Sequence, residues 1–442
     1  MYSSPVKNFG STATTIEPAR HVLGQLCMPG DKSISHRYAL LSALADGTST
    51  IKGYAPGTDC QTTLQCLKNL GVKIQIVDPM NEHNENIVSI TGCGLGGFSP
   101  TTYQLNAGNS GTTIRLLTGV LAAHVFKSEI TGDVSLRNRP MNRVIDPLQQ
   151  MGATIKSTKG CPPLQIHGSS LRGITYTPGV ASAQVKSAIL LAGLHASGET
   201  RVIESTPTRD HTERALLAFG VTVNQSKLNI HIFGGQHLSA TSLQVPGDLS
   251  SAAFWVAAAA SLPKSEIEIN EVGLNPSRTA FLDVLRTAGA NITVKISGER
   301  AGEAFGTIRV KHNPLNPFKV GLDTVPGLID ELPALAALAA NGGNLEVRGA
   351  AELRTKESDR IAILTSGLRK LGATVDEYQD GFHIHSTRQL TGGTVDAAGD
   401  HRMAMAFAIA ALGGKRPTTI TGSEVVDISY PGFFATLKSL CQ

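Results

Sequence analysis

Residues 33–51 read SISHRYALLSALADGTSTI, and their pattern makes the architecture predictable. A run rich in Ala and Leu comes first, a turn with Gly47 follows, and residues rich in Thr end the stretch. The first part is apolar nearly all round, which is typical of a buried helix, and the β-branched end is typical of a strand. The stretch therefore predicts one unit of buried helix, turn and strand.

This unit recurs along the whole chain, with successive copies about 70–80 residues apart. The further copies read SGTTIRLLTGVLAAHVFKSEI from residue 110, SAQVKSAILLAGLHASGETRVI from 182, SSAAFWVAAAASLPKSEIEI from 250, DELPALAALAANGGNLEV from 330 and HRMAMAFAIAALGGKRPTTI from 401. Because equivalent units pack around a shared core, we predict an α/β fold with these helices inside and the sheets outside.

A second, more amphipathic series of helices lies between these copies and should be exposed. Each of these helices ends at a glycine and turns directly into a strand, in LGVKIQI at Gly71, MGATIKS at Gly152, FGVTVNQ at Gly220, AGANITV at Gly289 and LGATVDE at Gly372. Glycine just past the last turn is the usual left-handed cap. The sixth copy, PGFFATLKSLCQ, reaches residue 442 before a strand can follow, so we expect the N-terminal segment to supply that strand.

The two halves of the chain also resemble each other. MPGDKSIS at residues 28–35 is echoed by VPGDLSS at 245–251. We predict two similar lobes of three repeats each: lobe I, made of residues 1–28 plus 247–442 and carrying both termini, and lobe II, made of residues 29–246. The crossovers near 29–30 and 246–247 should form a hinge, so that closure of the lobes assembles a site between them.

Composition excludes several classes of protein. The 442 residues are 41% hydrophobic and carry a formal net charge of only +4, so the chain is neither disordered nor a nucleic-acid-binding polycation. Apolar runs such as residues 252–260 are too short to cross a membrane, and no secretion signal is evident, so a cytoplasmic protein is expected. The six scattered cysteines predict reduced, mostly buried packing residues. The sequence calls for no metal and no organic cofactor.

Basic residues stand at the beginnings of many predicted helices: Lys32, Arg139, Arg209, Lys356, Arg360 and Arg402. A cation there opposes the helix dipole, whereas a bound phosphate or carboxylate would satisfy both the cation and the free N–H groups. We therefore predict a cleft between the lobes that holds several negative charges. For Asp59, Asp248, Ser250 and Ser277 we favour the simpler interpretation as helix caps.

Two other motifs have structural interpretations. GCGLGG at residues 92–97 resembles a dinucleotide fingerprint, but Phe98-Ser99-Pro100 follows where a helix should begin, so a turn is expected. His383 and His385 alternate along a predicted strand and share one face. No third metal ligand has a recognisable spacing, so we favour strand histidines over a metal site.

Eight strings in order resemble the 5-enolpyruvylshikimate-3-phosphate synthase family, from about residue 20 to the C-terminus. They are PGDKSISHR (29–37), GNSGTTIRL (108–116), GDVSLRNRPM (132–141), SAQVKSAILLAGL (182–194), TRDHTE (208–213), LIDELP (328–333), KESDRI (356–361) and GDHRMAM (399–405). The resemblance implies an inverse α/β barrel in each of two lobes, built from three βαβαββ repeats. It also implies an enzyme of the shikimate pathway, which leads to chorismate and the aromatic amino acids. That enzyme moves the enolpyruvyl group of phosphoenolpyruvate to the 5-hydroxyl of shikimate 3-phosphate by addition and elimination through a tetrahedral intermediate.

The resemblance also implies a role for individual residues. Contacts to shikimate 3-phosphate are expected from Lys32, Ser33, Arg37, Ser182, Gln184, Arg209, Asp330 and Lys356. Contacts to phosphoenolpyruvate are expected from Lys32, Gly111, Arg139, Gln184, Arg360 and Arg402. Asp330 resembles the base on the 5-hydroxyl. Glu357 and Lys32 are the candidates for moving the methylene proton, and His401 is expected to assist.

The chain departs from the family pattern at a few positions. Ala183, Thr208 and Glu352 stand where some relatives have Ser, Tyr and Asn, which resembles a second, bacterial subgroup. The Lys that many members carry before the final proline is missing from residues 425–430, which leaves one phosphoenolpyruvate contact open.

Three other classes of protein are alternatives to this family, and sequence features distinguish each of them. UDP-N-acetylglucosamine enolpyruvyl transferase shares the repeated fold, but its Cys-bearing loop would belong near residues 108–139, where this chain has no Cys. RNA 3′-phosphate cyclase uses the repeat with a nucleotidylated His that has no signature here. A binder of anionic polymers would need a basic stripe with stacking aromatics, yet aromatics are 5% of the chain. The expected partners are two small-molecule substrates, with no nucleic acid, no membrane and a monomeric chain.

Overall fold

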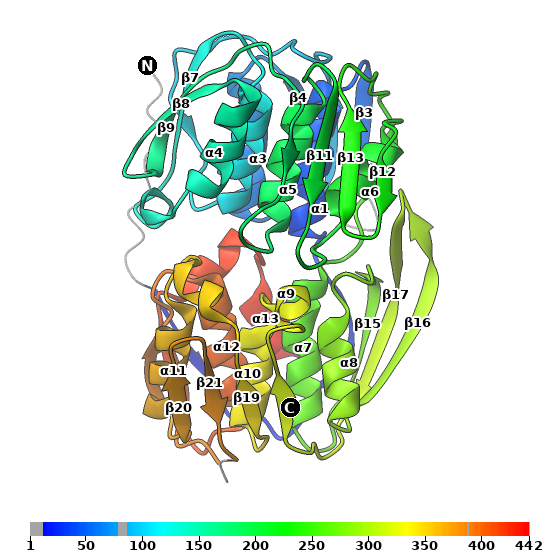
Figure 1. Ribbon diagram of the computed structural model, residues 1–442. Coiled ribbons are helices and arrows are strands. Elements are labelled where there is room, and N and C mark those ends of the chain that lie inside the picture. The colour runs from blue at the N-terminus through cyan, green and yellow to red at the C-terminus, as the bar shows by residue number, and fades with distance from the viewer. Residues whose placement is uncertain (1–11, 78–85, 387–388, 442) are drawn as a thin grey trace.

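The computed structural model describes residues 12–77, 86–386 and 389–441, which form two lobes (Figure 1). Each lobe has its own hydrophobic core. One core draws its buried residues from positions 34–245, and the other draws them from positions 16–28 and 249–440. The α/β class and the two-lobed arrangement are confirmed.

The six apolar helices form the centre of the lobes. They are α1 (Lys32–Leu44), α3 (Gly111–Leu121) and α5 (Ala183–Gly193) in lobe II, and α7 (Leu249–Ser261), α10 (Leu332–Ala340) and α12 (His401–Leu412) in lobe I. Every residue of α12 is buried, as is every residue of α7 before Ser261. A helix without a polar face is stable only when other elements cover it on all sides, which is the arrangement predicted.

The second series consists of helices that present one face to solvent. They are α2 (Thr58–Asn69), α4 (Asn142–Met151), α6 (His211–Ala218), α8 (Ala280–Thr287), α11 (Arg360–Lys370) and α13 (Phe433–Leu440). The glycines after the first five of these helices have φ between 84° and 120°, a region that side chains with a Cβ rarely adopt. The predicted left-handed caps are confirmed.

Three mixed sheets cover lobe II, each with four strands within the described residues. Their orders are β14 (Ser242–Gln244), β3 (Thr48–Lys52), β5 (Ile87–Thr91), β4 (Lys73–Val77); β6 (Leu105–Asn106), β7 (Lys127–Thr131), β9 (Cys161–His167), β8 (Thr154–Thr158); and β10 (Thr175–Tyr176), β11 (Glu199–Ile203), β13 (Asn229–Phe233), β12 (Asn224–Ser226). In each sheet the first strand runs parallel to its neighbour and the others pair antiparallel, so the three repeats are equivalent.

Lobe I repeats this plan. Its orders are β2 (Leu23–Cys27), β15 (Glu266–Gly273), β17 (Glu303–Lys311), β16 (Asn291–Arg300); β18 (Phe318–Val320), β19 (Leu345–Val347), β21 (Gly381–Ile384), β20 (Val375–Tyr378); and β22 (Gly393–Asp396), β23 (Thr418–Thr421), β1 (Ala13–Ile16). The shorter helical elements are α9 (Val325–Leu328) and the 3₁₀ turns Leu136–Asn138, Ala351–Thr355 and Ser423–Ile428. As predicted, the N-terminal segment completes the sixth unit, because β1 pairs antiparallel with β23.

At each crossover, the strand before the crossover pairs in one lobe and the helix after it belongs to the other lobe. β2 leads directly into α1 of lobe II, yet it pairs with β15 of lobe I. β14 leads into α7 of lobe I, yet it pairs with β3 of lobe II. The crossovers hydrogen-bond to each other, with Asp31 N 2.8 Å from Pro246 O and Asp248 N 2.9 Å from Pro29 O. Each lobe is therefore closed by the strand that precedes the other lobe's first helix.

Smaller predictions have mixed outcomes. The stretch 92–97 forms a turn, as expected. The expectation that most cysteines are buried is wrong: Cys60 and Cys66 are buried, whereas Cys27 and Cys93 are exposed on a strand end and in a loop. Within the described residues, no helix has both the length and the apolar character that crossing a membrane requires.

Candidate active site

A cavity of about 490 Å³ lies between the lobes and is lined by side chains from both. The first residues of the buried helices face it. Lys32 begins α1, Gly111 begins α3 and His401 begins α12, and all three line the cavity. Helix starts that converge on one space bring free N–H groups and positive dipole ends to it, which favours a bound anion.

Local capping explains why these helices begin at the cavity. Asp31, Ser110 and Asp400 accept hydrogen bonds from the backbone N–H groups of Ile34, Thr113 and Arg402. Asp248 caps α7 as predicted, by accepting from Ser251 N at 3.0 Å. The other three residues interpreted as caps are not caps, because Gly57 and Thr279 occupy the N-cap positions of α2 and α8, and Asp248 that of α7. Asp59, Ser250 and Ser277 instead make side-chain contacts with other segments.

The structure brings together thirteen of the fourteen residues predicted for the site. These are Lys32, Ser33, Gly111, Arg139, Ser182, Gln184, Arg209, Asp330, Lys356, Glu357, Arg360, His401 and Arg402.

Arg37 is the exception, because it lies behind the cavity wall. Its guanidinium is buried and donates hydrogen bonds to the hydroxyls of Thr212 and Ser187 and to the backbone oxygen of Ser33. Arg37 therefore lies directly behind the start of α1, bonded to the backbone of Ser33, and its contact with a substrate stays a prediction.

Cations surround the carboxylate of Asp330. Arg209 Nη2 from lobe II lies 2.9 Å from Oδ2, while Arg360 Nη1 and Lys356 Nζ lie 3.6 Å and 3.7 Å from Oδ1. Arg402 Nη1 donates to the backbone oxygen of Asp330 at 2.6 Å. Burial alone would raise the pKa of the Asp330 carboxyl, but Lys356, Arg209, Arg402 and Arg360 together hold it well below its usual range.

Glu357 has a similar environment one turn before α11. Its Oε1 lies 3.3 Å from Arg139 Nη1 of lobe II, and its Oε2 accepts from Arg360 Nη2. Its backbone oxygen accepts from the hydroxyl of Ser135 at 2.7 Å, which is a second contact between the lobes. Burial favours the neutral acid, yet Arg360 and Arg139 outweigh it and keep the pKa of Glu357 well below its usual range.

Lys32 and His401 complete this end of the cavity. Lys32 Nζ lies 3.0 Å from Asp59 Oδ2; burial disfavours the ammonium, but Asp59 outweighs it and raises the pKa of Lys32. Burial, followed by the charges of Lys32 and Arg402, holds the pKa of His401 well below its usual range. Neither ring nitrogen of His401 has a hydrogen-bond partner within the described part of the chain. The site therefore combines a charged ammonium with a neutral imidazole.

Arg115 also lines the cavity, although it was not predicted from the sequence. Its Nη1 donates to Gln184 Oε1 at 2.6 Å, and Gln184 Nε2 donates to Thr112 Oγ1 at 2.8 Å. Burial, followed by the charges of Arg143 and Arg139, lowers the pKa of Arg115 to about 10. A signal was present, because Arg115 follows Gly111 by four residues and therefore shares its helix face.

Gly111 leaves space for these guanidinium groups. A Cβ at position 111 would lie 2.7 Å from Arg115 Nη1 and 3.3 Å from Arg139 Nη1. Any larger residue would therefore displace Arg115 or Arg139 from its place beside the start of α3.

The balance of charge in the cavity favours anionic ligands. Nine basic and six acidic residues line it. Several of the acidic residues already pair with the basic ones, and the pair between Arg143 Nη1 and Glu352 Oε1, 2.9 Å long, also joins the two lobes. Anions that enter this cavity must compete with the protein's own carboxylates for the same cations.

Comparison with known proteins gives a consistent picture. A family model described as EPSP synthase (3-phosphoshikimate 1-carboxyvinyltransferase) matches residues 16–437. The 3-phosphoshikimate 1-carboxyvinyltransferase of Koribacter versatilis is 45% identical over 97% of this chain and 99% of its own length. That of Bacillus subtilis is 44% identical over 95% of this chain and 97% of its own. The solved EPSP synthase of Acinetobacter baumannii superposes with a TM-score of 0.84 at 41% identity, covering 97% of this chain and 98% of that one.

Proposed function

The chain belongs to the EPSP synthase family, and from that premise we propose how its residues divide the work of the reaction. It is a transferase of the shikimate pathway: it transfers the enolpyruvyl group of phosphoenolpyruvate to the 5-hydroxyl of shikimate 3-phosphate and releases phosphate. Both substrates are anions, so the chemistry depends on cations that hold them and on groups that move two protons.

The first part of the proposal concerns where the substrates bind. Shikimate 3-phosphate binds against Ser33, Ser182, Gln184, Arg209 and Lys356, and phosphoenolpyruvate binds against Gly111, Gln184, Arg139, Arg360 and Arg402. Lys32 lies between the two and touches both. The observation that carries this division is the position of Asp330, whose carboxylate lies 2.9 Å from Arg209 and 3.6 Å from Arg360. The two sets of cations therefore meet at one carboxylate, where the reacting groups must also meet.

Asp330 acts as the base on the 5-hydroxyl. Its ion pairs make it a weak base in this structure, because they hold its pKa well below the usual range. Substrate phosphate and carboxylate groups compete for Arg209, Arg360 and Arg402 and bring negative charge close to Asp330. Both effects raise its pKa, so substrate binding itself activates the base.

Glu357 and Lys32 transfer the second proton, which goes to and from the methylene carbon of phosphoenolpyruvate, and His401 lies beside them. As the 5-oxygen attacks C2 of phosphoenolpyruvate, the methylene carbon takes a proton, and a tetrahedral intermediate forms. Loss of phosphate and return of that proton then regenerate the double bond. Lys32 can donate as an ammonium. Glu357 can donate only after it has taken up a proton from water, which becomes possible once phosphoenolpyruvate has drawn Arg139 and Arg360 away from its carboxylate and its pKa has risen.

The proposal also includes the boundaries of the lobes, the hinge between them, the oligomeric state and the cellular location. Lobe I consists of residues 1–28 plus 247–442, lobe II consists of residues 29–246, and the paired crossovers are the hinge about which the lobes close. Arg37, whose guanidinium also holds the backbone oxygen of Ser33, contributes to the shikimate 3-phosphate end of the site. The enzyme works as a monomer in the cytoplasm, and light scattering of the purified chain tests the monomer.

A phosphorus NMR experiment tests the reaction directly. The purified chain is mixed with shikimate 3-phosphate and phosphoenolpyruvate. Loss of both substrate signals, with inorganic phosphate and one new phosphomonoester appearing together, is the expected result. Phosphate without a new ester would mean hydrolysis and would contradict the proposal. If no signal changes, a second sample with UDP-N-acetylglucosamine as acceptor distinguishes a transferase of different specificity.

A further inference from the structure

A cluster of three side chains lies on the sheet of the fifth repeat, outside the cavity between the lobes. Asp376 belongs to β20, His383 belongs to β21, and His385 follows directly after β21. None of the three lines the cavity. The sequence indicated the two histidines but no third ligand.

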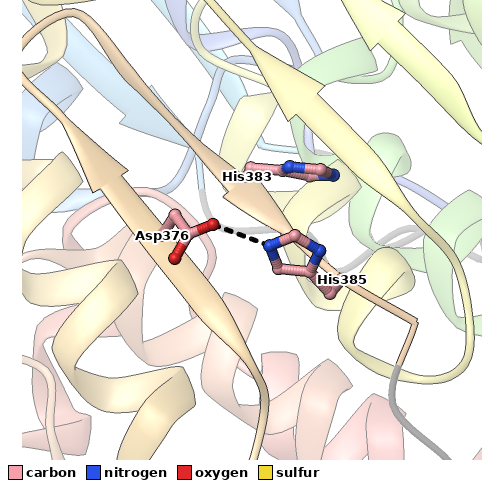
Figure 2. Close-up of side chains that lie close together, drawn as sticks. All are labelled: Asp376, His383 and His385. Atoms are coloured by element: carbon pink, nitrogen blue, oxygen red, sulfur yellow. Dashed lines mark hydrogen bonds and ion pairs between the residues drawn. The ribbon is translucent and has the colours of Figure 1, made fainter.

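Strand pairing brings the third side chain to them. Asp376 and His383 are direct partners in the antiparallel pair of β20 and β21. His385 N donates to Thr374 O at 3.0 Å, so the same register continues past the end of β21. Residues two apart on a strand share a face, and so do direct partners on adjacent strands. All three side chains therefore project from one face of the sheet (Figure 2).

The side-chain atoms of the cluster are close together. His385 Nε2 lies 2.7 Å from Asp376 Oδ2, the contact that Figure 2 marks with a dashed line. The two imidazole rings have centroids 3.9 Å apart. One possible ligand atom from each residue lies within 4.8 Å of the other two, and this is the only such group of three His, Cys, Asp or Glu residues that the described residues contain.

We propose that His383, His385 and Asp376 bind one divalent transition-metal ion, with Zn²⁺ as the natural occupant and water completing its coordination. Imidazole nitrogens and a carboxylate oxygen are the donors that Zn²⁺ accepts in proteins. Two ligands of a tetrahedral zinc ion lie about 3.3 Å apart, given zinc–ligand distances of about 2.0–2.2 Å. The wider pairs in the cluster must contract, while the 2.7 Å pair of His385 and Asp376 must separate slightly and exchange its hydrogen bond for two bonds to the ion. Side-chain rotation can supply both shifts because His385 and Asp376 have 37% and 58% of their side chains exposed.

The hydrogen-bond partner of His383 leaves one of its ring nitrogens able to bind a cation. His383 Nε2 lies 3.0 Å from Asn344 Oδ1, which can only accept, so this nitrogen carries the proton and Nδ1 keeps its lone pair. A ligating histidine is usually oriented by such a bond from its other nitrogen. Glu346, the direct partner of His383 on β19, shares this face and is paired with Lys319 Nζ at 2.7 Å.

The ion would join β20 and β21, the adjacent strands of one hairpin, and would take no part in the transfer reaction. Zinc should therefore stabilise the folded chain without changing turnover, since an ion that binds only the folded state stabilises it by mass action. This separates the proposal from the proposed function, which requires neither the ion nor these three residues.

Calorimetric titration of the full, untagged chain with Zn²⁺ tests the site, after treatment with a chelator and its removal. The wild-type chain is expected to bind one equivalent of zinc that the double variant His383→Asn/His385→Asn does not bind. Asp376→Asn should weaken that equivalent at least tenfold. Zinc should raise the Tm of the wild-type chain and leave the Tm of the double variant unchanged.

A matched control uses another exposed pair. His237 Nε2 lies 2.8 Å from Asp46 Oδ2 on the surface of lobe II, so His237→Asn removes an exposed histidine of the same kind and should keep the full equivalent. The exposed thiols of Cys27 and Cys93 are present in every variant, so zinc bound there is common to all titrations. Circular dichroism checks that each variant is folded. Equal zinc stoichiometry and affinity in the wild-type chain and the folded double variant would overturn the proposal.

Discussion

Arg209 of lobe II and Asp330 of lobe I form an ion pair 2.9 Å long across the cavity. The two side chains are only 14% and 18% exposed, so water screens the pair weakly. The pair links substrate binding to proton transfer, because the cation proposed to hold the phosphate of shikimate 3-phosphate is, with Lys356, Arg402 and Arg360, one of those that keep Asp330 ionised. Binding a dianion at Arg209 must therefore change the basicity of Asp330.

Replacing this carboxylate separates catalysis from binding. Asp330→Asn keeps the shape of the side chain but cannot accept the 5-hydroxyl proton. We expect kcat to fall by about 10²–10⁴-fold, while the affinity for shikimate 3-phosphate stays equal or rises because Arg209 loses its internal competitor. Steady-state kinetics and calorimetric binding measure the two effects. The exposed Asp283→Asn on α8 serves as the control, and a fully active Asp330→Asn enzyme would exclude the base role.

The same carboxylates predict how stability depends on pH. The cations around Asp330 and Glu357 lower both pKa values below those of the unfolded chain, near 3.8 and 4.5. A carboxyl with a depressed pKa stabilises the folded state above its unfolded pKa, and this stabilisation is lost as the pH falls through the folded value. The free energy of unfolding in urea should therefore fall below about pH 4. Asp330→Asn should make this fall shallower; an unchanged slope would mean that Asp330 has no depressed pKa.

Gly111→Ala should affect one substrate only. The added Cβ would lie 2.7 Å from Arg115 Nη1 and 3.3 Å from Arg139 Nη1, so a guanidinium at the phosphoenolpyruvate end must move. A misplacement of about 1 Å in a positioning group can cost about 10²-fold in rate, and we expect KM for phosphoenolpyruvate to rise at least several-fold. KM for shikimate 3-phosphate should stay constant. Gly179→Ala is the matched control, since Gly179 lines the same cavity and its Cβ would meet no described atom within 4 Å.

Arg278, a buried arginine beside the crossovers, should contribute far more to the free energy of unfolding than an exposed arginine does. Arg278 Nη1 lies 2.5 Å from Asp31 Oδ2, and both side chains are 2% exposed. Arg278→Met leaves the Asp31 carboxylate buried without its cation, which should cost about 3–5 kcal/mol of unfolding free energy. Arg286→Met, eight residues along the chain, removes an exposed pair with Asp283 and should cost under about 1 kcal/mol. Equal losses in denaturant titrations of the two variants would contradict this account.

Local signals made much of the fold predictable. Asp31 and Ser110 cap helices within three residues of themselves, and Gly152 ends α4 within one turn, so a sequence window contains both partners of each interaction. The cationic helix starts were informative for the same reason, because Lys32 and Arg402 conflict with their own helix dipoles unless an anion is near.

Features that depend on distant pairing could not be predicted. Asp376 joins His383 through strand register, which spacing along the chain does not reveal. The motif that contains Arg37 gave no sign of the partners of its guanidinium, because Thr212 and Ser187 come from other segments. Asp59 was interpreted as a cap, although its partner, Lys32, lies 27 residues away.

The exchange of β2 and β14 sets the order in which the chain can fold during synthesis. Lobe II is contiguous, so it can fold as soon as β14 has emerged. β2 must wait for β15, about 240 residues later, which takes about 12–50 s at 5–20 residues per second. β1 waits longer still, for β23. During that interval the backbone N–H and C=O groups of β1 and β2 have no partner strand on the nascent chain, so these two strands are the last to become part of a sheet although they are synthesised first.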